Sequence, residues 1–336
     1  MTLAARPAGM HGDAALIGLD WGSSRLRAAL LAADGTVLEA RHADAGASTL
    51  RGGATAFSMA LTALIGDWHV GPSGVLLPVL ACGMAGSQHG WREAPYLPCP
   101  ADAAALVAAS VRVDWQGQAV HLLPGLCCTL AGQAPDVMRG EETQALGALS
   151  AARTLRASSV LVMPGTHSKW AWVRQGQIQG FATHMTGELF AVLSQHSVLG
   201  RLLPQEMDWS APAPDHDHAP SCQAAFAEGV RAAWQDDGGG LLHQLFAVRT
   251  RGLIDQWPGA ALRELLSGLL LGHELRAGLA WRRQHAADAP LALVGEEALT
   301  ARYAQALALC APDVALQPVP DPAQCVWRAL ASFVAH

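Results

Sequence analysis

Apolar and polar residues alternate in blocks along this chain, and one block near its middle has a distinctive pattern. Val160–Met163 is apolar, Pro164 and Gly165 interrupt it, Thr166–Lys169 is polar, and Trp170–Val173 is apolar again. A buried run, a polar turn and a second buried run predict a β-hairpin. Its tip would present backbone N–H groups, hydroxyl groups and one ammonium group to a single point, which suits phosphate binding.

The same pattern occurs once before, about half the chain length earlier, as apolar Leu16–Leu19, polar Asp20–Ser24 and apolar Leu26–Leu31. Two such units predict an internal duplication in which two hairpins face each other across a cleft. The alternative is a pair of unrelated hairpins with glycine turns. Because both turns contain glycine and two hydroxyl side chains, and the first also contains a carboxylate, the pattern favours a split nucleotide site.

The remaining pattern predicts an α/β chain in which strands and helices are arranged around mixed sheets. The further predicted strands cover residues 36–41, 75–81, 119–123, 178–183, 291–294 and 314–316. The predicted helices cover residues 54–65, 100–111, 145–153, 185–201, 226–234, 241–249, 262–283, 298–309 and 321–335.

Composition narrows the class of protein. With 336 residues, of which 51% are hydrophobic, the chain can form about two domains with separate cores. The formal net charge is −6 and no basic block occurs, which argues against nucleic acid as a partner. No apolar run approaches the roughly 18 residues of a membrane span. The seven cysteines are odd in number and lack CxxC spacing, so we interpret them as reduced thiols of a cytoplasmic protein.

Two adjacent carboxylates, Glu141 and Glu142, follow a glycine at a predicted helix start. Acidic residues are typical of helix N-termini, where the macrodipole favours them. The alternative is that one of them acts as a base or as a magnesium partner. Arg139 lies beside them and is a candidate anion clamp.

A long loop over residues 82–96 leaves a predicted buried strand and contains Gln88, Trp91 and Arg92. Polar and aromatic loops at strand ends are typical of binding sites, although a solvated connection is the alternative. Further along, Thr186 and Glu188 could cap a helix or reach a ligand. No P-loop, GxGxxG or GxSxG motif occurs in the expected context, so those enzyme classes are not supported.

Seven blocks of the chain together resemble the 2-dehydro-3-deoxygalactonokinase family. They are LDWGSSRLRAALL, GMAGSQHGWREAPYLPCPA, PDVMRGEETQALG, MPGTHSKWAWV, MTGELFAVLSQHSVLGR, LLHQLFAVRTRGL and SGLLLGHEL. The family belongs to the actin, sugar kinase and heat-shock ATPase superfamily. The resemblance implies two ribonuclease-H-like domains, over residues 1–153 and 154–320, with ATP in the cleft between them. The final helix over 321–336 is expected to pack back on the first domain.

The resemblance also implies an activity and roles for individual residues. The activity is ATP-dependent phosphorylation of the 6-hydroxyl of 2-dehydro-3-deoxy-D-galactonate in galactonate catabolism. Asp20 would hold Mg²⁺ through water, and Glu141 is favoured over Glu142 as the base, with Asp20 as a competing base. Phosphate contacts would come from Gly22, Ser23 and Ser24 in the first turn, and from Gly165, Thr166, His167, Ser168 and Lys169 in the second. Gly295 and Glu296 would lie by the adenosine.

For the sugar acid, the resemblance and the loop positions give a set of candidates. Arg25, Arg92 and Arg139 are candidate clamps for its carboxylate, and Gln88, Trp91, Thr186 and Glu188 are expected to line the sugar. The chain departs from the family pattern in its Ala-rich leader, in the loop around Asp215, and at Cys325-Val326, which could affect the adenosine wall.

Two alternatives to this activity remain at this stage. One is a kinase for another 2-keto-3-deoxy sugar acid, and the other is an ATP-dependent scaffold or chaperone-like protein of the same fold. The apolar helix predicted over 262–283 also permits a homodimer.

Overall fold

The computed structural model describes residues 13–68, 76–204, 220–235, 239–287 and 289–334, and the chain divides into two compact units. Unit 1 contains Met1–Ser158, Val173–Phe181 and Val319–His336. Unit 2 contains Ser159–Trp172 and Ala182–Pro318. The leader and most of the loop around Asp215 lie outside the described residues.

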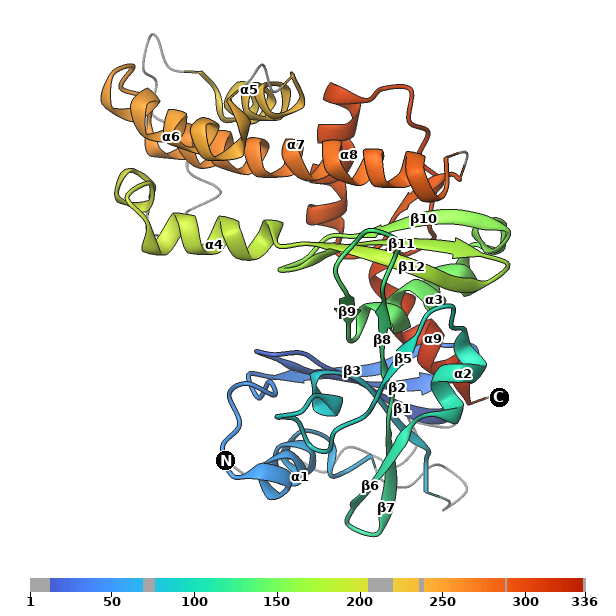
Figure 1. Cartoon of the computed structure of the whole chain (residues 1–336). Helices are drawn as coiled ribbons and strands as arrows, with labels where there is room; N and C mark the ends of the chain where they lie inside the picture. Colours follow the sequence, from blue (N-terminus) through green and yellow to red (C-terminus); the bar gives the residue numbers. More distant parts are fainter. Residues whose placement is uncertain (1–12, 69–75, 205–219, 236–238, 288, 335–336) are drawn as a thin grey trace. The chain divides into compact units, whose positions relative to one another are not determined.

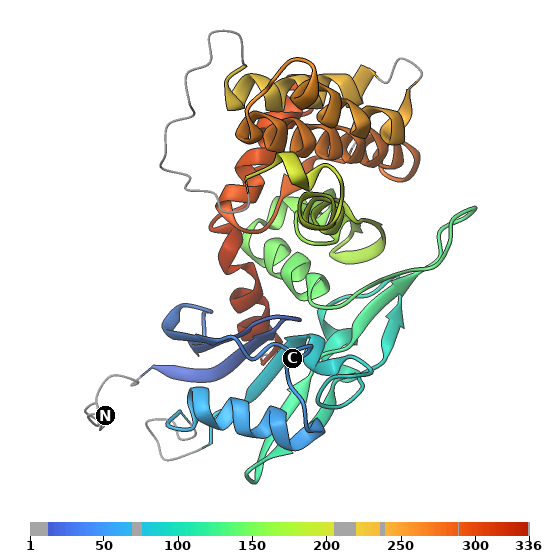
Figure 2. The same ribbon diagram turned by 90° about the vertical axis from the view of Figure 1, so that its left-hand side faces the viewer.

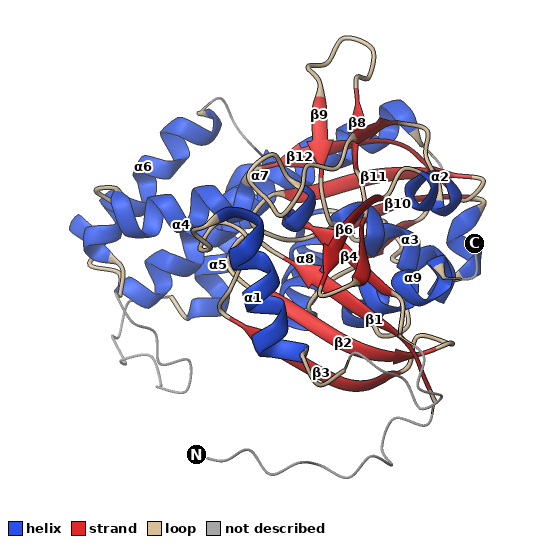
Figure 3. Ribbon diagram, turned by 90° about the horizontal axis from the view of Figure 1, so that it is seen from below, coloured by secondary structure: helices blue, strands red, loops and turns tan. Residues whose placement is uncertain are grey.

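Unit 1 is built on a six-stranded sheet (Figure 1). Its order is β3 (Val37–Ala43), β2 (Leu26–Ala32), β1 (Ala14–Trp21), β4 (Val79–Gly83), β7 (Gln118–Leu122) and β6 (Val111–Trp115). β1 to β3 form an antiparallel meander, visible in Figure 3, and β4 and β7 extend the sheet parallel to β1. This is the ribonuclease-H-like arrangement that the resemblance implies, so the predicted fold class is confirmed.

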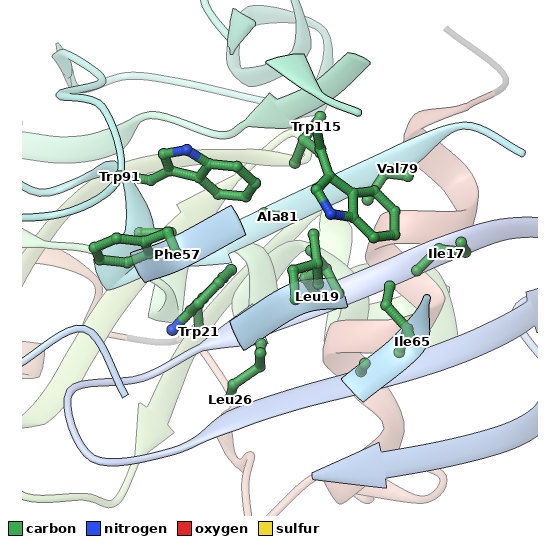
Figure 4. Packing of buried hydrophobic residues seen from close by; sticks show 14 of the residues in the cluster. Ile17, Leu19, Trp21, Leu26, Phe57, Ile65, Val79, Ala81, Trp91 and Trp115 are labelled. Atoms are coloured by element: carbon green, nitrogen blue, oxygen red, sulfur yellow. The ribbon is translucent and has the colours of Figure 1, made fainter. Parts of the chain in front are cut away.

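Different helices cover the two faces of β1, because side chains alternate along a strand. Leu19 and Trp21 are fully buried in a cluster that includes residues of α1 (Gly53–Ile65), as Figure 4 shows. Gly18 faces the other way, and a Cβ atom there would lie 3.0 Å from a leucine of α9 (Cys325–Phe333). The alternation therefore places α1 and α9 on opposite faces of the sheet.

Helix α3 (Glu141–Ala151) packs closely on α9. The contact depends on Gly147, where a Cβ atom would lie 1.7 Å from the Cys325 carbonyl oxygen. Cys325 and Val326 are buried there in unit 1. An effect of these two residues on an adenosine wall is not supported, because they are buried residues of α9 and do not line the cavity of unit 2 described below.

Unit 1 also contains a small sheet and a short helix. The sheet has the order β5 (Tyr96–Pro98), β8 (Gly125–Cys128) and β9 (Asp136–Met138), and the helix is α2 (Ala103–Ala108). β5, β6, β8 and β9 were not predicted, and the helix predicted over 100–111 was too long, because α2 ends at Ala108 and β6 begins at Val111. Strands of three or four residues are too short to produce a recognisable period.

A second sheet has the order β12 (Gln177–His184), β11 (Ser168–Arg174), β10 (Ser158–Met163) and β13 (Leu291–Leu293), with β10 parallel to β13. This repeats the order β3-β2-β1-β4 of the first sheet, which supports the predicted duplication. The boundary of the two units passes through β11 and β12. The strand predicted over 314–316 is reduced to one isolated bridge between Leu316 and Leu291.

The helices of unit 2 are α4 (Thr186–His196), α5 (Cys222–Gln235), α6 (Gly240–Leu253), α7 (Gly259–His285) and α8 (Glu297–Cys310). Figure 2 shows the gold and orange helices α5 to α7 packed together. α5 and α7 approach closely through glycines, since a Cβ atom at position 268 would lie 2.2 Å from the Phe226 carbonyl oxygen. Most of the apolar side chains of α7 are buried, so this helix does not offer the exposed surface that a homodimer would need. Among the described residues, none of the helices has the length and apolar character that a membrane span requires.

Candidate functional site

The first turn, between β1 and β2, contains Gly22, Ser23, Ser24 and Arg25. The loop that follows β3 forms hydrogen bonds to the backbone carbonyl groups of this turn. N–H groups of residues 46, 47 and 48 donate to the carbonyl oxygens of Ser24, Gly22 and Ser23 at 3.1, 2.9 and 3.0 Å. This approach requires Gly46, because a Cβ atom there would lie 2.2 Å from the Ser23 carbonyl oxygen. Ser23 and Ser24 are exposed, so their hydroxyl groups are available to a ligand.

Asp20 lies just before this turn, and its carboxylate is between two neighbours from adjacent strands. It pairs in register with Arg27 of β2 and with Cys82 of β4. The Arg27 guanidinium forms an ion pair with Asp20, and the Cys82 Sγ lies 4.0 Å from the Asp20 Oδ1. Arg27 is not among the predicted site residues, although a four-residue turn places residue 27 opposite residue 20 in an antiparallel pair.

A magnesium ion would find a single carboxylate at Asp20. No group of three or more His, Cys, Asp or Glu side chains that could hold a metal occurs in the parts of the chain that the structure describes. Mg²⁺ in kinases commonly binds one or two carboxylates together with substrate phosphates and water. The donors at Asp20 therefore fit an ion that arrives with a phosphate ligand.

The two glutamates at the start of α3 differ in accessibility. Glu142 is 0% exposed, its carboxylate accepts the Gly140 N–H at 2.7 Å, and it accepts the Thr143 hydroxyl at 3.1 Å. Burial, followed by the charge of Glu141, raises the pKa of Glu142 to about 8. Glu141 is half-buried and accepts the Arg139 N–H at 3.1 Å. Glu141 is therefore the glutamate that a substrate can reach.

Asp20, Cys82 and the start of α3 lie close together. A Cβ atom at Gly140 would lie 3.4 Å from the Cα of Gly83, the residue that ends β4. Burial, then the charges of Asp20 and Glu142, raise the pKa of the Cys82 thiol. The ends of β1 and β4 and the N-terminus of α3 thus gather a small acidic cluster in unit 1.

The loop of residues 82–96 presents some of its predicted ligands and buries another. Gln88 and Arg92 are exposed, and the Arg92 Nη1 donates to the Arg112 carbonyl oxygen at 3.1 Å. Trp91 is only 7% exposed, and its ring lies 5.8 Å from that of Trp21 in the core (Figure 4). The interpretation of Trp91 as a sugar ligand is therefore not supported, because this side chain anchors the loop to the core.

Arg139 is buried, yet part of its guanidinium lacks a partner. Its Nη2 donates to the Ala94 carbonyl oxygen at 2.9 Å, and its Cζ lies 4.2 Å from the centroid of the Tyr96 ring. Its Nε and Nη1 have no hydrogen-bond partner among the described residues. Arg25, by contrast, is exposed and has an ion pair with Asp44 at 3.3 Å. A buried cation without full hydrogen bonding is costly, which favours an anionic partner for Arg139.

The second turn, between β10 and β11, exposes fewer of its polar side chains than the sequence predicted. Thr166 and His167 are exposed. Ser168 is 0% exposed and Lys169 is 3% exposed, because β11 begins at Ser168 and both side chains enter the interior. The Lys169 Nζ donates to the His167 carbonyl oxygen at 3.2 Å. The prediction that the side chains of Ser168 and Lys169 face the phosphate is therefore wrong in this structure.

The N-terminus of α4 packs directly on the second turn. The Glu188 N–H donates to the Thr166 carbonyl oxygen at 2.9 Å, and the Glu188 carboxylate pairs with the His167 ring. Gly187 permits this approach, since a Cβ atom there would lie 2.4 Å from the Gly165 carbonyl oxygen. A helix N-terminus beside a glycine turn favours anions. Glu188 is thus engaged with the turn, which is not the sugar-lining position that the sequence predicted.

A cavity of about 580 Å³ in unit 2 begins at this turn and extends between α4, α7 and α8. Phe190, Leu270, Leu271 and Leu299 give it apolar walls, and Gly165 and Thr186 lie at the turn. On the α7–α8 side, Arg302 donates to Glu264 at 2.6 Å and to Ser267 at 3.0 Å. Pockets of this size with apolar walls and a few polar groups are typical of small-molecule sites.

Gly295 and Glu296 lie between β13 and α8, where the sequence predicted the adenosine. Glu296 is the N-cap residue of α8, and the lining of the cavity begins two residues later, at Ala298. Neither residue lines the cavity directly. The residues that do line it on α7 and α8 were not predicted, because only tertiary packing brings these two helices together.

Comparisons with known proteins agree with the resemblance. A model of the 2-keto-3-deoxy-galactonokinase family matches residues 20–332. The chain is 36% identical over 321 residues to the 2-dehydro-3-deoxygalactonokinase of Escherichia coli (strain K12), which covers 95% of this chain and 98% of that protein. The crystal structure of a Sinorhizobium meliloti protein assigned as a 2-dehydro-3-deoxygalactonokinase matches with a TM-score of 0.76 and 31% identity, covering 95% of this chain and 98% of the other.

Proposed function

This chain belongs to the 2-keto-3-deoxy-galactonokinase family, and from that premise we propose that it transfers the terminal phosphate of ATP to the 6-hydroxyl of 2-dehydro-3-deoxy-D-galactonate. The observation that carries the proposal is the apolar cavity of unit 2, which begins at a glycine turn capped by the N-terminus of α4. An apolar pocket joined to an anion-binding helix terminus matches a purine joined to phosphates.

In this proposal unit 2 binds the nucleotide. The adenosine occupies the cavity, with Gly295 and Glu296 beyond its edge at the start of α8. The phosphates lie at the turn, where Gly165, Thr166 and His167 present backbone and exposed side-chain groups. Ser168 and Lys169 support the turn from inside, and Thr186 and Glu188 position it through the start of α4.

The first turn of unit 1 acts on the phosphate that is transferred. Gly22, Ser23 and Ser24 contact it with backbone and hydroxyl groups, and Asp20 is the residue that would hold Mg²⁺. The ion, when bound with ATP, neutralises charge on the phosphate oxygens. Arg27 fixes the Asp20 carboxylate in place through its ion pair.

Glu141 is the proposed base. Its carboxylate accepts the proton of the 6-hydroxyl while the 6-oxygen bonds to the terminal phosphorus, and the bond from that phosphorus to the bridging oxygen breaks to release ADP. Glu142 cannot take this role because it is fully buried against Gly140 and Thr143. It holds the Gly140 N–H and thereby positions Glu141.

Arg139 is the favoured ligand for the carboxylate of the sugar acid. Its Nε–H and Nη1–H groups are buried without a hydrogen-bond partner among the described residues, so each has a hydrogen bond to donate to an anion. Arg25, Arg92 and Gln88 are exposed and remain candidate contacts with the sugar acid.

A cytoplasmic location is part of the proposal. So is a homodimer, for which the exposed Leu242, Phe246 and Ile254 at α6 are a candidate surface.

The test is an assay of ADP release with Mg-ATP and 2-dehydro-3-deoxy-D-galactonate, run beside the gluconate-derived epimer and other 2-keto-3-deoxy acids. The proposal expects the galactonate derivative to give the highest kcat/KM. Turnover on a different acid would retain the kinase and replace the substrate. Slow ATP hydrolysis that no sugar acid stimulates would contradict the kinase and favour a scaffold.

A further inference from the structure

A chain of buried hydrogen bonds joins three elements of unit 2. The Ser168 Oγ lies 2.7 Å from the Tyr303 hydroxyl, which lies 2.7 Å from the Glu274 Oε2. The Trp170 Nε1 donates to the Glu274 Oε1 at 3.0 Å. The four side chains come from β11, α7 and α8, and each is at most 5% exposed.

The chemistry of these groups fixes the direction of the bonds. The indole N–H of Trp170 is a donor only, so Glu274 accepts it. Tyr303 donates its hydroxyl proton to the other oxygen of Glu274, which leaves the Tyr303 oxygen to accept the proton of Ser168. The Ser168 proton is therefore committed to Tyr303 and does not serve a phosphate.

This network connects the two parts of the proposed nucleotide site. Ser168 is the first residue after the exposed turn that carries Thr166 and His167. Tyr303 lines the cavity and directs its hydroxyl group into the network. Trp170 also belongs to the network, and close packing holds its ring, since a Cβ atom at Gly278 would lie 2.3 Å from that ring. The network thus ties the turn to the cavity wall through the bond between Ser168 and Tyr303, and Glu274 holds the Tyr303 hydroxyl in place from its other side.

We propose that Glu274 and the Tyr303 hydroxyl are positioning groups that hold the second turn at the distance from the cavity that the phosphates of ATP require. This inference rests on the proposed nucleotide site and deepens it. Neither group touches a reacting atom. If the network acts in this way, its loss weakens recognition of the phosphates and leaves recognition of adenosine intact.

The experiment compares the dissociation constants of ATP and of adenosine, measured by calorimetry on the full chain without a sugar acid. Tyr303→Phe retains the ring in the cavity wall and removes only the hydroxyl group. We expect its affinity for ATP to fall by about five- to tenfold, the scale of one buried hydrogen bond, and its affinity for adenosine to stay within about twofold. Tyr96 is the only other tyrosine in the sequence. Tyr96→Phe removes its hydroxyl group, is the matched control, and should change neither dissociation constant.

Ser168→Ala removes the same hydrogen bond from the side of the turn, and it replaces Tyr303→Phe in the experiment if that variant does not fold. It should give the same selective loss, and the double variant should lose no more than either single one, because both remove one connection. Equal losses for ATP and adenosine, or no loss in either folded variant, would overturn the inference. A wild-type chain that binds neither ligand would instead contradict the nucleotide site itself, and kinase activity of the wild type distinguishes the two failures.

Discussion

The two turns of this chain begin from the same sequence design and differ in the groups that they expose. In unit 1, the hydroxyl groups of Ser23 and Ser24 stay exposed, and Asp20 precedes them. In unit 2, Ser168 and Lys169 are drawn into the interior by β11, and the N-terminus of α4 covers the turn. The first turn therefore offers a carboxylate and hydroxyl groups, and the second offers backbone groups and a helix terminus.

This difference matches a division of labour within phosphoryl transfer. The chemical step needs charge neutralisation and a base near the transferred phosphate, and unit 1 gathers Asp20, Glu141 and the exposed serines. Nucleotide binding needs an apolar wall and a fixed anion site, and in the proposed function the cavity and α4 of unit 2 supply them. A duplicated fold can thus acquire two roles when the residues that follow each turn differ.

The largest effect should come from removing the base, a group that unit 1 alone is proposed to supply. Glu141→Gln keeps the size of the side chain and cannot accept the substrate proton. We expect kcat to fall by about 10²–10⁴-fold with little change in the affinity for ATP. Steady-state kinetics with calorimetry would measure both quantities.

Glu142→Gln is the matched variant beside it. Because Glu142 is buried, it should retain far more activity than Glu141→Gln. The reverse order of activities would exchange the roles of the two glutamates.

The next largest effect should follow from Asp20→Asn. The amide binds Mg²⁺ less strongly than a carboxylate and loses the ion pair with Arg27, so kcat should fall by roughly 10²–10³-fold. The exposed Asp313, changed to Asn, is the control in unit 2. A variant whose activity recovers fully at high Mg²⁺ would show that Asp20 contributes metal affinity alone, and one with normal activity would remove Asp20 from the site.

Two glycines allow the turns to be disturbed separately. Gly46→Ala would push a Cβ atom against the first turn, and Gly187→Ala against the second, at 2.2 and 2.4 Å from carbonyl oxygens. Each should lower the free energy of unfolding by about 1–3 kcal/mol through overpacking. The kinetic effects should separate, with kcat lowered in Gly46→Ala and KM for ATP raised in Gly187→Ala. Identical kinetic changes would remove the distinction between the turns.

The buried Glu142 should give unit 1 a pH dependence of stability. Burial raises the pKa of Glu142 from 4.5 to about 8, so the folded chain keeps this proton where the unfolded chain has lost it. The free energy of unfolding should therefore fall as the pH rises from 4.5 towards 8, by about 2 kcal/mol between pH 5 and 7.

Denaturant titrations at several pH values would measure this slope. Glu142→Gln should flatten it, whereas the exposed Glu297, changed to Gln, should not. A slope that persists unchanged in Glu142→Gln would assign it to other groups.

The sequence predicts both hairpins and most long elements because their apolar runs are long, as for α7 and β10. Pattern alone does not predict β5, β8 and β9, which are too short, nor β6 and the true length of α2. For individual side chains, the sequence does not reveal which of them are buried in the folded chain. Trp91 resembles a ligand of an exposed loop and is held in the core by Trp21 and Phe57.

The candidate site shows the same limit. Ser168 and Lys169 belong to a polar run, yet the position at which β11 begins decides that they turn inward. The sequence does not reveal the cavity, because α7 and α8 meet only through tertiary packing. Register, in contrast, was available from the sequence, and it would have identified Arg27 opposite Asp20.

The division of labour is tested most directly by one pair of hydroxyl deletions, Ser23→Ala in the first turn and Thr166→Ala in the second. Single-turnover phosphoryl transfer and ADP affinity would be measured for both. We expect Ser23→Ala to slow transfer by about tenfold with ADP affinity nearly unchanged, and Thr166→Ala to weaken ADP by several-fold with a smaller effect on transfer at saturation. The opposite assignment, or the same profile in both variants, would contradict the account.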